Sequence, residues 1–213
     1  HAKNIVLVSH LGRPKGRSAE FSLKHVIKRV ERLLGRDVGF AESIEEAALL
    51  QEQSPSGSVI LLENIRFCVG EEKNDKDLSQ KLATLCDIYV NDAFGTSHRA
   101  HSSTCGIAEF AKERVAGLLL KKEIDSFAKA MANPLKPVLL IVGGSKVSSK
   151  LALLYNILDV VDKIIIGGAM SNTFLKACGY DMQKSLVEED LVAEAKKILE
   201  HAREKKVKIY LPV

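Results

Sequence analysis

Short runs of Ile, Val and Leu alternate along this chain with longer segments whose apolar residues recur at helical spacing. Such alternation predicts stacked β-α-β units, in which helices cover both faces of a parallel sheet. The chain is therefore expected to have an α/β fold built of parallel sheets covered by helices. The predicted strands are 5–8, 59–62, 88–90, 138–142, 164–166 and 207–211.

Two predicted helices carry terminal signals. Apolar residues recur at helical spacing between Ser22, a candidate N-cap, and Gly35, a candidate C-cap. Ser43 followed three residues later by Glu46 predicts a capping box at the start of another helix.

The join between two domains is expected at an amphipathic helix over 118–132, which Asn133 and Pro134 end. Loops before this helix are rich in His and Arg, whereas those after it are rich in Gly pairs and Lys. The two halves therefore present different chemistry. The predicted division is 1–117 for the first domain, 118–136 for the connecting helix and linker, and 137–213 for the second domain.

Composition excludes several classes of protein. With 46% hydrophobic and 27% charged residues over 213 positions, the chain is typical of a globular protein. Its longest apolar runs, such as 138–142, are too short to span a bilayer, so no membrane association is expected. A net charge of +4, spread along the chain, suits phosphate ligands as well as nucleic acid, but 5% aromatics and no Trp argue against stacking on single strands.

The cysteines and the chain ends suggest where the protein works and how much of it is present. Four cysteines lie far apart without a C-x-x-C pair, and no secretory signal opens the chain, so reduced thiols in a cytoplasmic protein are expected. Strand-like runs lie close to both His1 and Val213. Both ends are therefore interpreted as cut.

Three polar motifs follow predicted strands in the first half, where the ligand crevice of a parallel sheet lies. SHLGRPKGR at 9–17 offers a His, a close-approach Gly and an Arg that suit an anion, although a basic surface turn has the same composition. LLENIRF at 61–67 brings Arg66, which by itself is equally explained as an Arg at a strand edge. VNDAFGTSHRAHSS at 90–103 is a long polar loop, and loops of this kind often carry functional residues. The alternative is a hydrogen-bonded loop whose histidines satisfy buried backbone groups. Its H-x-x-H spacing lacks the helical form of a metal site.

Two Gly-Gly motifs follow predicted strands in the second half. VGGSKVSSK at 142–150 and IIIGGAMSNTFLK at 164–176 each run from a strand into a helix, which favours an anion or nucleotide site at neighbouring strand ends. Lys146 and Lys150, four apart, are expected to share one helix face. The pattern matches neither a Walker A loop nor a dinucleotide fingerprint, and a single Gly pair is explained by a tight turn.

Taken together, SHLGRP, ENIRF, VNDAFGTSHRAHSS, GGSKVSSK and GGAMSNTFLK resemble the phosphoglycerate kinase family, in that family's order and over essentially the whole chain. The resemblance implies parts of two Rossmann-like lobes joined by a helix that belongs to the hinge. It implies reversible phosphoryl transfer from 1,3-bisphosphoglycerate to ADP, giving 3-phosphoglycerate and ATP in glycolysis, with Mg²⁺ accompanying the nucleotide.

The resemblance also assigns site residues by motif match. Those implied to contact the glycerate substrate are His10, Leu11, Gly12, Arg13, Arg66 and Arg99. Those implied to line the nucleotide site are Gly144, Ser145, Lys146, Lys150 and Ala169, and Lys146 is also implied to be catalytic by reaching the transferred phosphoryl group. No residue of this chain is implied to bind the metal. Binding to neither nucleic acid nor membrane is expected, and the full-length family member is expected to be a monomer.

Some segments of the family are not found. Its D-x-N-V-P strand would precede His1, and its W-N-G-P and G-G-G-D-[ST] segments, with the magnesium-coordinating Asp, would follow Val213. The chain is therefore expected to be an internal fragment that is inactive by itself. The alternative is a non-catalytic module that holds an anion at His10, Arg13 and Arg99.

Overall fold

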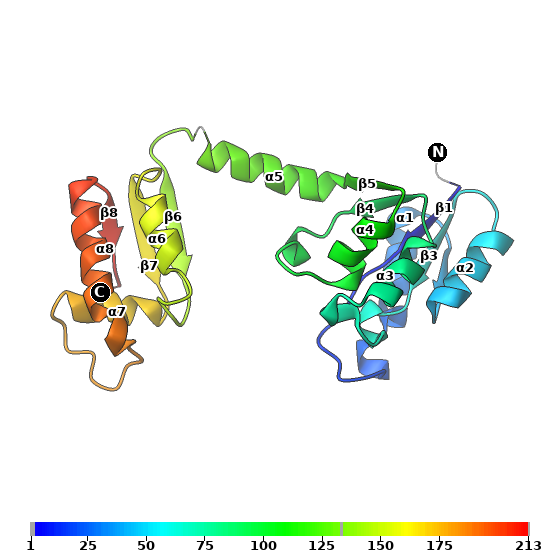
Figure 1. Ribbon diagram of the computed structural model, residues 1–213, viewed down its shortest axis with the longest axis horizontal. Helices are drawn as coiled ribbons and strands as arrows, with labels where there is room; N and C mark the ends of the chain where they lie inside the picture. The colour runs from blue at the N-terminus through cyan, green and yellow to red at the C-terminus, as the bar shows by residue number, and fades with distance from the viewer. Residues whose placement is uncertain (1–2, 133, 213) are drawn as a thin grey trace. The chain divides into compact units, whose positions relative to one another are not determined.

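The structure, a computed structural model, describes residues 3–132 and 134–212. The chain divides into two compact units, one up to Glu123 and one from Ile124 onward (Figure 1). The division falls within helix α5, Leu118–Met131, which confirms the predicted helix over 118–132 to within a residue. Asn133, the residue predicted to end it, lies outside the described residues.

The first unit contains a parallel sheet of three strands in the order β1-β3-β2. Its strands are β1 Asn4–Leu7, β2 Val38–Ala41 and β3 Ser58–Leu62. The central strand β3 pairs with both neighbours, Val6 lying beside Ile60 and Phe40 beside Leu61. Four of its five residues are buried, as expected for a parallel strand covered on both faces.

Helices cover both faces of this sheet. Alternate residues of β3 point to opposite faces, so Val59 and Leu61 pack beneath α1, whereas Ile60 and Leu62 pack beneath the other helices. The helices of the unit are α1 Ile27–Leu34, α2 Ile44–Gln53, α3 Lys76–Ala83 and α4 Ile107–Phe110. The predicted α/β layering is confirmed here.

The predicted caps form, with two local differences. The Ser22 hydroxyl accepts a hydrogen bond from Lys24 N at 3.2 Å, but the chain first makes a 3-10 turn, so that α1 begins only at Ile27. Gly35 ends α1 with a φ of 65°. Ser43 Oγ accepts from Glu46 N at 3.1 Å, and the Glu46 carboxylate accepts from Glu42 N rather than from Ser43 N.

The sequence pattern missed two strands. β2 reads VGFA and contains a glycine, and β5, Glu113–Ala116, reads ERVA with two charged residues, so neither forms an apolar run. β5 pairs in parallel with β4, Ile88–Asn91, as a two-stranded sheet. Pairing with a neighbouring strand, which local composition does not report, creates these strands.

The second unit contains a parallel sheet in the order β6-β7-β8. Its strands are β6 Leu139–Gly143, β7 Lys163–Gly167 and β8 Lys208–Tyr210, and its helices are α6 Leu151–Ile157, α7 Met170–Ala177 and α8 Val192–Glu204. One core joins the sheet to all three helices, with Ile164, Phe174 and Ile198 fully buried. On the opposite face Ile141 and Tyr210 are exposed, so the described helices cover one face of this sheet where two were expected.

No helix of residues 3–132 and 134–212 combines the length and apolarity needed to cross a membrane.

Candidate functional site

The loops that follow β1 and β3 in the first unit are joined by side chains from the second of them. Asn64 Nδ2 donates to the Leu11 carbonyl at 2.8 Å, and Arg66 Nη1 donates to the Gly12 carbonyl at 2.5 Å. Both loops leave the carboxyl ends of adjacent parallel strands. The motifs at 9–17 and 61–67, about fifty residues apart in sequence, therefore form one surface.

Gly12 is required by this arrangement. Its φ is 64°, and a Cβ placed on it would lie 2.4 Å from the ring of Phe21. Asn64 also donates to the Phe21 carbonyl at 2.9 Å, which anchors the backbone of Phe21 in this loop. A side chain at position 12 would meet both backbone strain and a clash.

Positive charges gather around His10. Burial lowers the pKa of His10 below its ordinary value of 6.5, and the charge of Arg66 lowers it further. Arg99 and His101 act in the same direction, whereas Glu71 opposes them. Groups from two other loops therefore act on the imidazole of His10, and a bound anion would relieve the repulsion among the positive charges.

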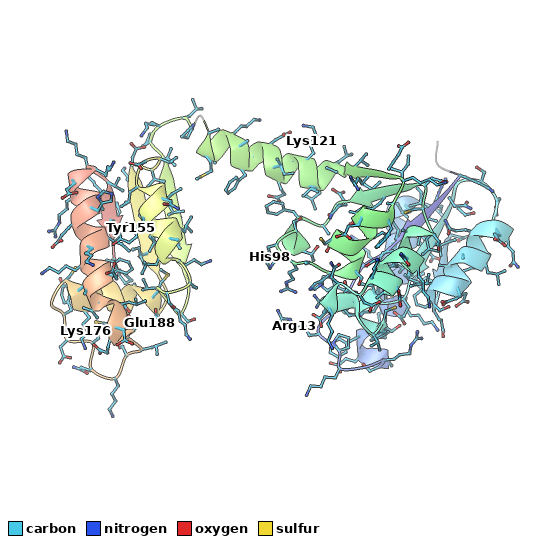
Figure 2. All side chains as sticks on the ribbon, viewed as in Figure 1. Arg13, His98, Lys121, Tyr155, Lys176 and Glu188 are labelled. Atoms are coloured by element: carbon cyan, nitrogen blue, oxygen red, sulfur yellow. The ribbon has the colours of Figure 1, made fainter. Side chains whose placement is uncertain are left out.

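The three candidate arginines differ in their surroundings. Arg13 is exposed (Figure 2). Within the described residues its guanidinium has no hydrogen bond or ion pair. Arg99 is half-buried, with Nε 3.3 Å from His98 Nε2. The side chain of Arg66 is 5% exposed and holds the Gly12 carbonyl, so one of its nitrogens is already committed to the protein. Arg13 and Arg99 are thus better placed to meet a ligand than Arg66.

The motif at 90–103, called here the histidine-rich loop, has an exposed part and a buried part. His98 is exposed, whereas His101 is 8% exposed with Nδ1 3.4 Å from Glu71 Oε1. Ser102 is fully buried and donates to the Asp75 carbonyl at 3.0 Å. The interpretation as a hydrogen-bonded loop therefore applies to residues 101–103, whereas residues 98–99 form a more exposed polar part.

In the second unit the two Gly pairs come together at the carboxyl ends of β6 and β7. Gly143 lies beside Gly167 in the sheet, and Met170 N donates to the Gly144 carbonyl at 2.9 Å. Gly168 has a φ of 70°, and a Cβ there would lie 2.8 Å from Gly144 O. The structure therefore brings together Gly144, Ser145 and the turn that leads to Ala169, which immediately precedes α7.

The expectation that Lys146 and Lys150 share a helix face is wrong. Both side chains are exposed, but Lys146 lies in an irregular segment and Lys150 in a turn closed by its N–H donating to Val147 O at 2.8 Å. Helix α6 begins only at Leu151. A carboxylate from a distant part of the chain accepts hydrogen bonds from the N–H groups of Val147 and Ser148. These hydrogen bonds hold the segment before α6 in a non-helical conformation.

That carboxylate is Glu188, which the sequence did not single out. Its side chain accepts hydrogen bonds from the Val147 and Ser148 N–H groups and from Ser148 Oγ, the last at 2.7 Å. The Ser148 hydroxyl is the main cause that holds the pKa of Glu188 below its ordinary value, and Lys146 also lowers it. Glu188 therefore occupies N–H groups that the Gly-Gly-helix pattern suggested for a phosphate.

The sequence also gave no separate signal for Asn64 or Glu71. Asn64 lies inside the ENIRF motif directly before Arg66, which was a usable hint. Glu71 and Glu188 are each one of several neighbouring acidic residues. Nothing local distinguishes a buried carboxylate from its exposed neighbours.

Among the described residues no group of three or more His, Cys, Asp or Glu side chains is arranged to hold a metal ion. Glu188, which lies at the Gly-Gly loops, is committed to Val147 and Ser148.

Comparison with known proteins matches the family model described as phosphoglycerate kinase to residues 1–213. The phosphoglycerate kinase of Helicobacter hepaticus is 85% identical over 213 residues, which is 100% of this chain and 53% of that protein. The Wolinella succinogenes phosphoglycerate kinase is 73% identical over 212 residues, with 100% and 53% covered. The chain thus spans about half the length of the curated relatives it matches.

Solved structures show the same likeness. The phosphoglycerate kinase of Coxiella burnetii matches with a TM-score of 0.82 and 44% identity, over 98% of this chain and 53% of that one. The Pyrococcus horikoshii phosphoglycerate kinase matches with a TM-score of 0.75 and 28% identity, over 98% and 55%.

Proposed function

The chain belongs to the phosphoglycerate kinase family, and from this premise we propose that it supplies substrate-binding parts of an enzyme that moves a phosphoryl group between 1,3-bisphosphoglycerate and ADP. In this proposal residues 1–117 form part of the glycerate lobe, 118–136 connect the lobes, and 137–213 form part of the nucleotide lobe. One observation carries it: three loops distant in sequence converge so that Arg66 and Arg99 act on His10. Such a cluster suits a ligand with phosphate and carboxylate groups.

We assign different roles to the residues of the glycerate site. Arg13 and Arg99 bind the anionic groups of the substrate through guanidinium N–H donors, and His10 donates a further hydrogen bond. Arg66, Leu11 and Gly12 shape the site, because the side chain of Arg66 is engaged with the Gly12 carbonyl.

On the nucleotide side, Lys146 and Lys150 neutralise phosphate charge, and Lys146 approaches the transferred phosphoryl group. Gly144, Ser145 and Ala169 line the site and let the nucleotide approach the backbone. Phosphoryl transfer needs mainly positioning and neutralisation of spreading charge, which such cations provide. Mg²⁺ accompanies the nucleotide phosphates, and no residue of this chain is assigned to it.

The chain by itself is proposed not to complete the reaction, because the relatives it matches are about twice as long. Its location is proposed to be the cytoplasm, which suits its four free cysteines.

Calorimetric titration of the 213-residue chain with 3-phosphoglycerate tests the glycerate site. We expect binding that Arg99→Ala weakens about tenfold or more, since a charge-assisted hydrogen bond contributes about 1.5–3 kcal/mol. Equal affinity of the two chains would reject the role of Arg99. Binding of 3-phosphoglycerate without any response to ADP would favour a non-catalytic anion-binding module.

A further inference from the structure

One buried carboxylate of the first unit has no role in the assignments above. Glu71 is 2% exposed and lies in a short 3-10 turn, Glu71–Lys73, that follows the motif containing Arg66. A buried carboxylate is unfavourable unless hydrogen bonds and opposite charges compensate its loss of water. Its surroundings should therefore show what it stabilises.

The partners of Glu71 lie on the histidine-rich loop. Ser103 Oγ donates to Glu71 Oε1 at 2.6 Å, and His101 Nδ1 lies 3.4 Å from the same oxygen. The other oxygen, Oε2, is buried and has no hydrogen-bond partner in the described part of the chain. Glu71 thus connects its own turn to residues 101–103, which directly follow Arg99.

The neighbouring acid makes a different connection. Glu72 is about half exposed, and its Oε1 lies 3.7 Å from Nε of Arg66. Two consecutive carboxylates therefore contact two different segments near His10. Glu72 lies near Arg66 with an exposed side chain, and Glu71 contacts residues 101–103 with a buried one.

Charge gives Glu71 a second effect. The groups that act on His10 are the cations Arg66 and Arg99, together with His101, and Glu71 acts in the opposite sense to all three. Cations placed close together repel one another, and a buried negative charge beneath them reduces that repulsion before any substrate arrives.

We propose that Glu71 is a positioning residue of the anion site, which fixes the loop carrying Arg99 and balances the positive charge gathered around His10. Identifying the anion as the glycerate substrate rests on the proposed function; the role of Glu71 within the cluster does not. Glu71 itself does not contact the substrate.

The substitution Glu71→Gln tests this, because Gln retains the size and an acceptor oxygen but not the charge. Histidine titration followed by NMR on the 213-residue chain is the readout, and the His10 signal is identified by its loss in His10→Gln. We expect the pKa of His10 to fall further below its ordinary value in Glu71→Gln, since the group that raises it has been neutralised. We also expect faster amide exchange at residues 99–103.

Glu63→Gln is the matched control. Glu63 is a carboxylate of the same unit that is 6% exposed and accepts from Ser22 Oγ and Leu23 N, both at 2.7 Å. The Glu63→Gln substitution removes a buried charge but no group that acts on His10. It therefore reports the general destabilisation caused by losing a buried carboxylate. An unchanged His10 titration in Glu71→Gln, or an equal change in both variants, would overturn the proposal.

A second measurement keeps this result separate from the proposed function. Titration with 3-phosphoglycerate should give about tenfold weaker binding to Glu71→Gln than to the unaltered chain. Equal binding would overturn the positioning role. If the unaltered chain does not bind 3-phosphoglycerate, the proposed glycerate site is rejected, and the His10 titration still decides the role of Glu71.

Discussion

Replacing Gly168 by Ala should destabilise the second unit through two separable effects. A residue with a Cβ at a φ of 70° pays about 1–2 kcal/mol for the left-handed conformation. The added carbon would also lie 2.8 Å from O and 3.0 Å from N of Gly144, both backbone atoms. Overpacking of this kind costs about 1–3 kcal/mol. The expected loss is therefore about 2–5 kcal/mol.

Gly179→Ala provides the matched control. Gly179 has a φ of 95°, but a Cβ there would meet nothing within 4 Å, so this variant carries the conformational cost without the clash. We expect it to lose about 1–2 kcal/mol. The difference between the two variants measures how closely the two Gly-Gly loops pack.

Amide hydrogen exchange is the suitable assay, because a chain of two units need not unfold in a single transition. Amides of β6 and β7 should exchange faster in Gly168→Ala than in Gly179→Ala, while those of the first unit stay unchanged. If the two variants lose equal stability, the inference that these loops meet backbone to backbone at Gly144 and Gly168 is wrong.

Two further predictions concern stability. Phe174→Ala removes a ring that is 0% exposed in the core of the second unit, and should cost about 3–5 kcal/mol by amide exchange of α7 and β7; a loss below about 1 kcal/mol would contradict the burial of that ring. Burial acts to raise the pKa of Glu63, but hydrogen bonds from Leu23 N, Ser22 Oγ and Asn64 N outweigh it and hold the pKa below its ordinary value of 4.5. Ionised Glu63 should therefore stabilise the first unit above that pH and lose this effect as the pH falls through its lowered pKa. Denaturation of the unaltered chain and of Glu63→Gln across the acid range checks this, and an equal slope in both would refute it.

Most of the strand pattern was predictable because the strands of a covered parallel sheet are short apolar runs. β3 and β7 were predicted for that reason; four of the five residues of β3 are buried, and Ile164 and Ile166 of β7 are fully buried. β2 and β5 were missed because Gly39 interrupts one and charged residues occupy the other. In these two strands pairing with neighbours outweighs local preference.

The candidate site residues could be chosen from their motifs, but the sequence did not show which of them already make contacts within the protein. Arg13 and Arg66 look alike in sequence, yet one is exposed and the other 5% exposed at the Gly12 carbonyl. The Gly-Gly-helix pattern suggested free N–H groups for a phosphate, and Glu188 already holds those of Val147 and Ser148.

The sequence by itself determined the alternation of strands and helices, the loops that bear the polar residues, and the family to which they point. Those features depend on periodicity and on motifs whose residues are neighbours in the chain. Tertiary structure alone decided that Glu71 lies beneath the histidine-rich loop and that Glu188 binds the loop before α6. Their partners are 32 and 40 residues away in sequence, so the path of the folded chain, rather than any local pattern, brings these carboxylates to the groups they stabilise.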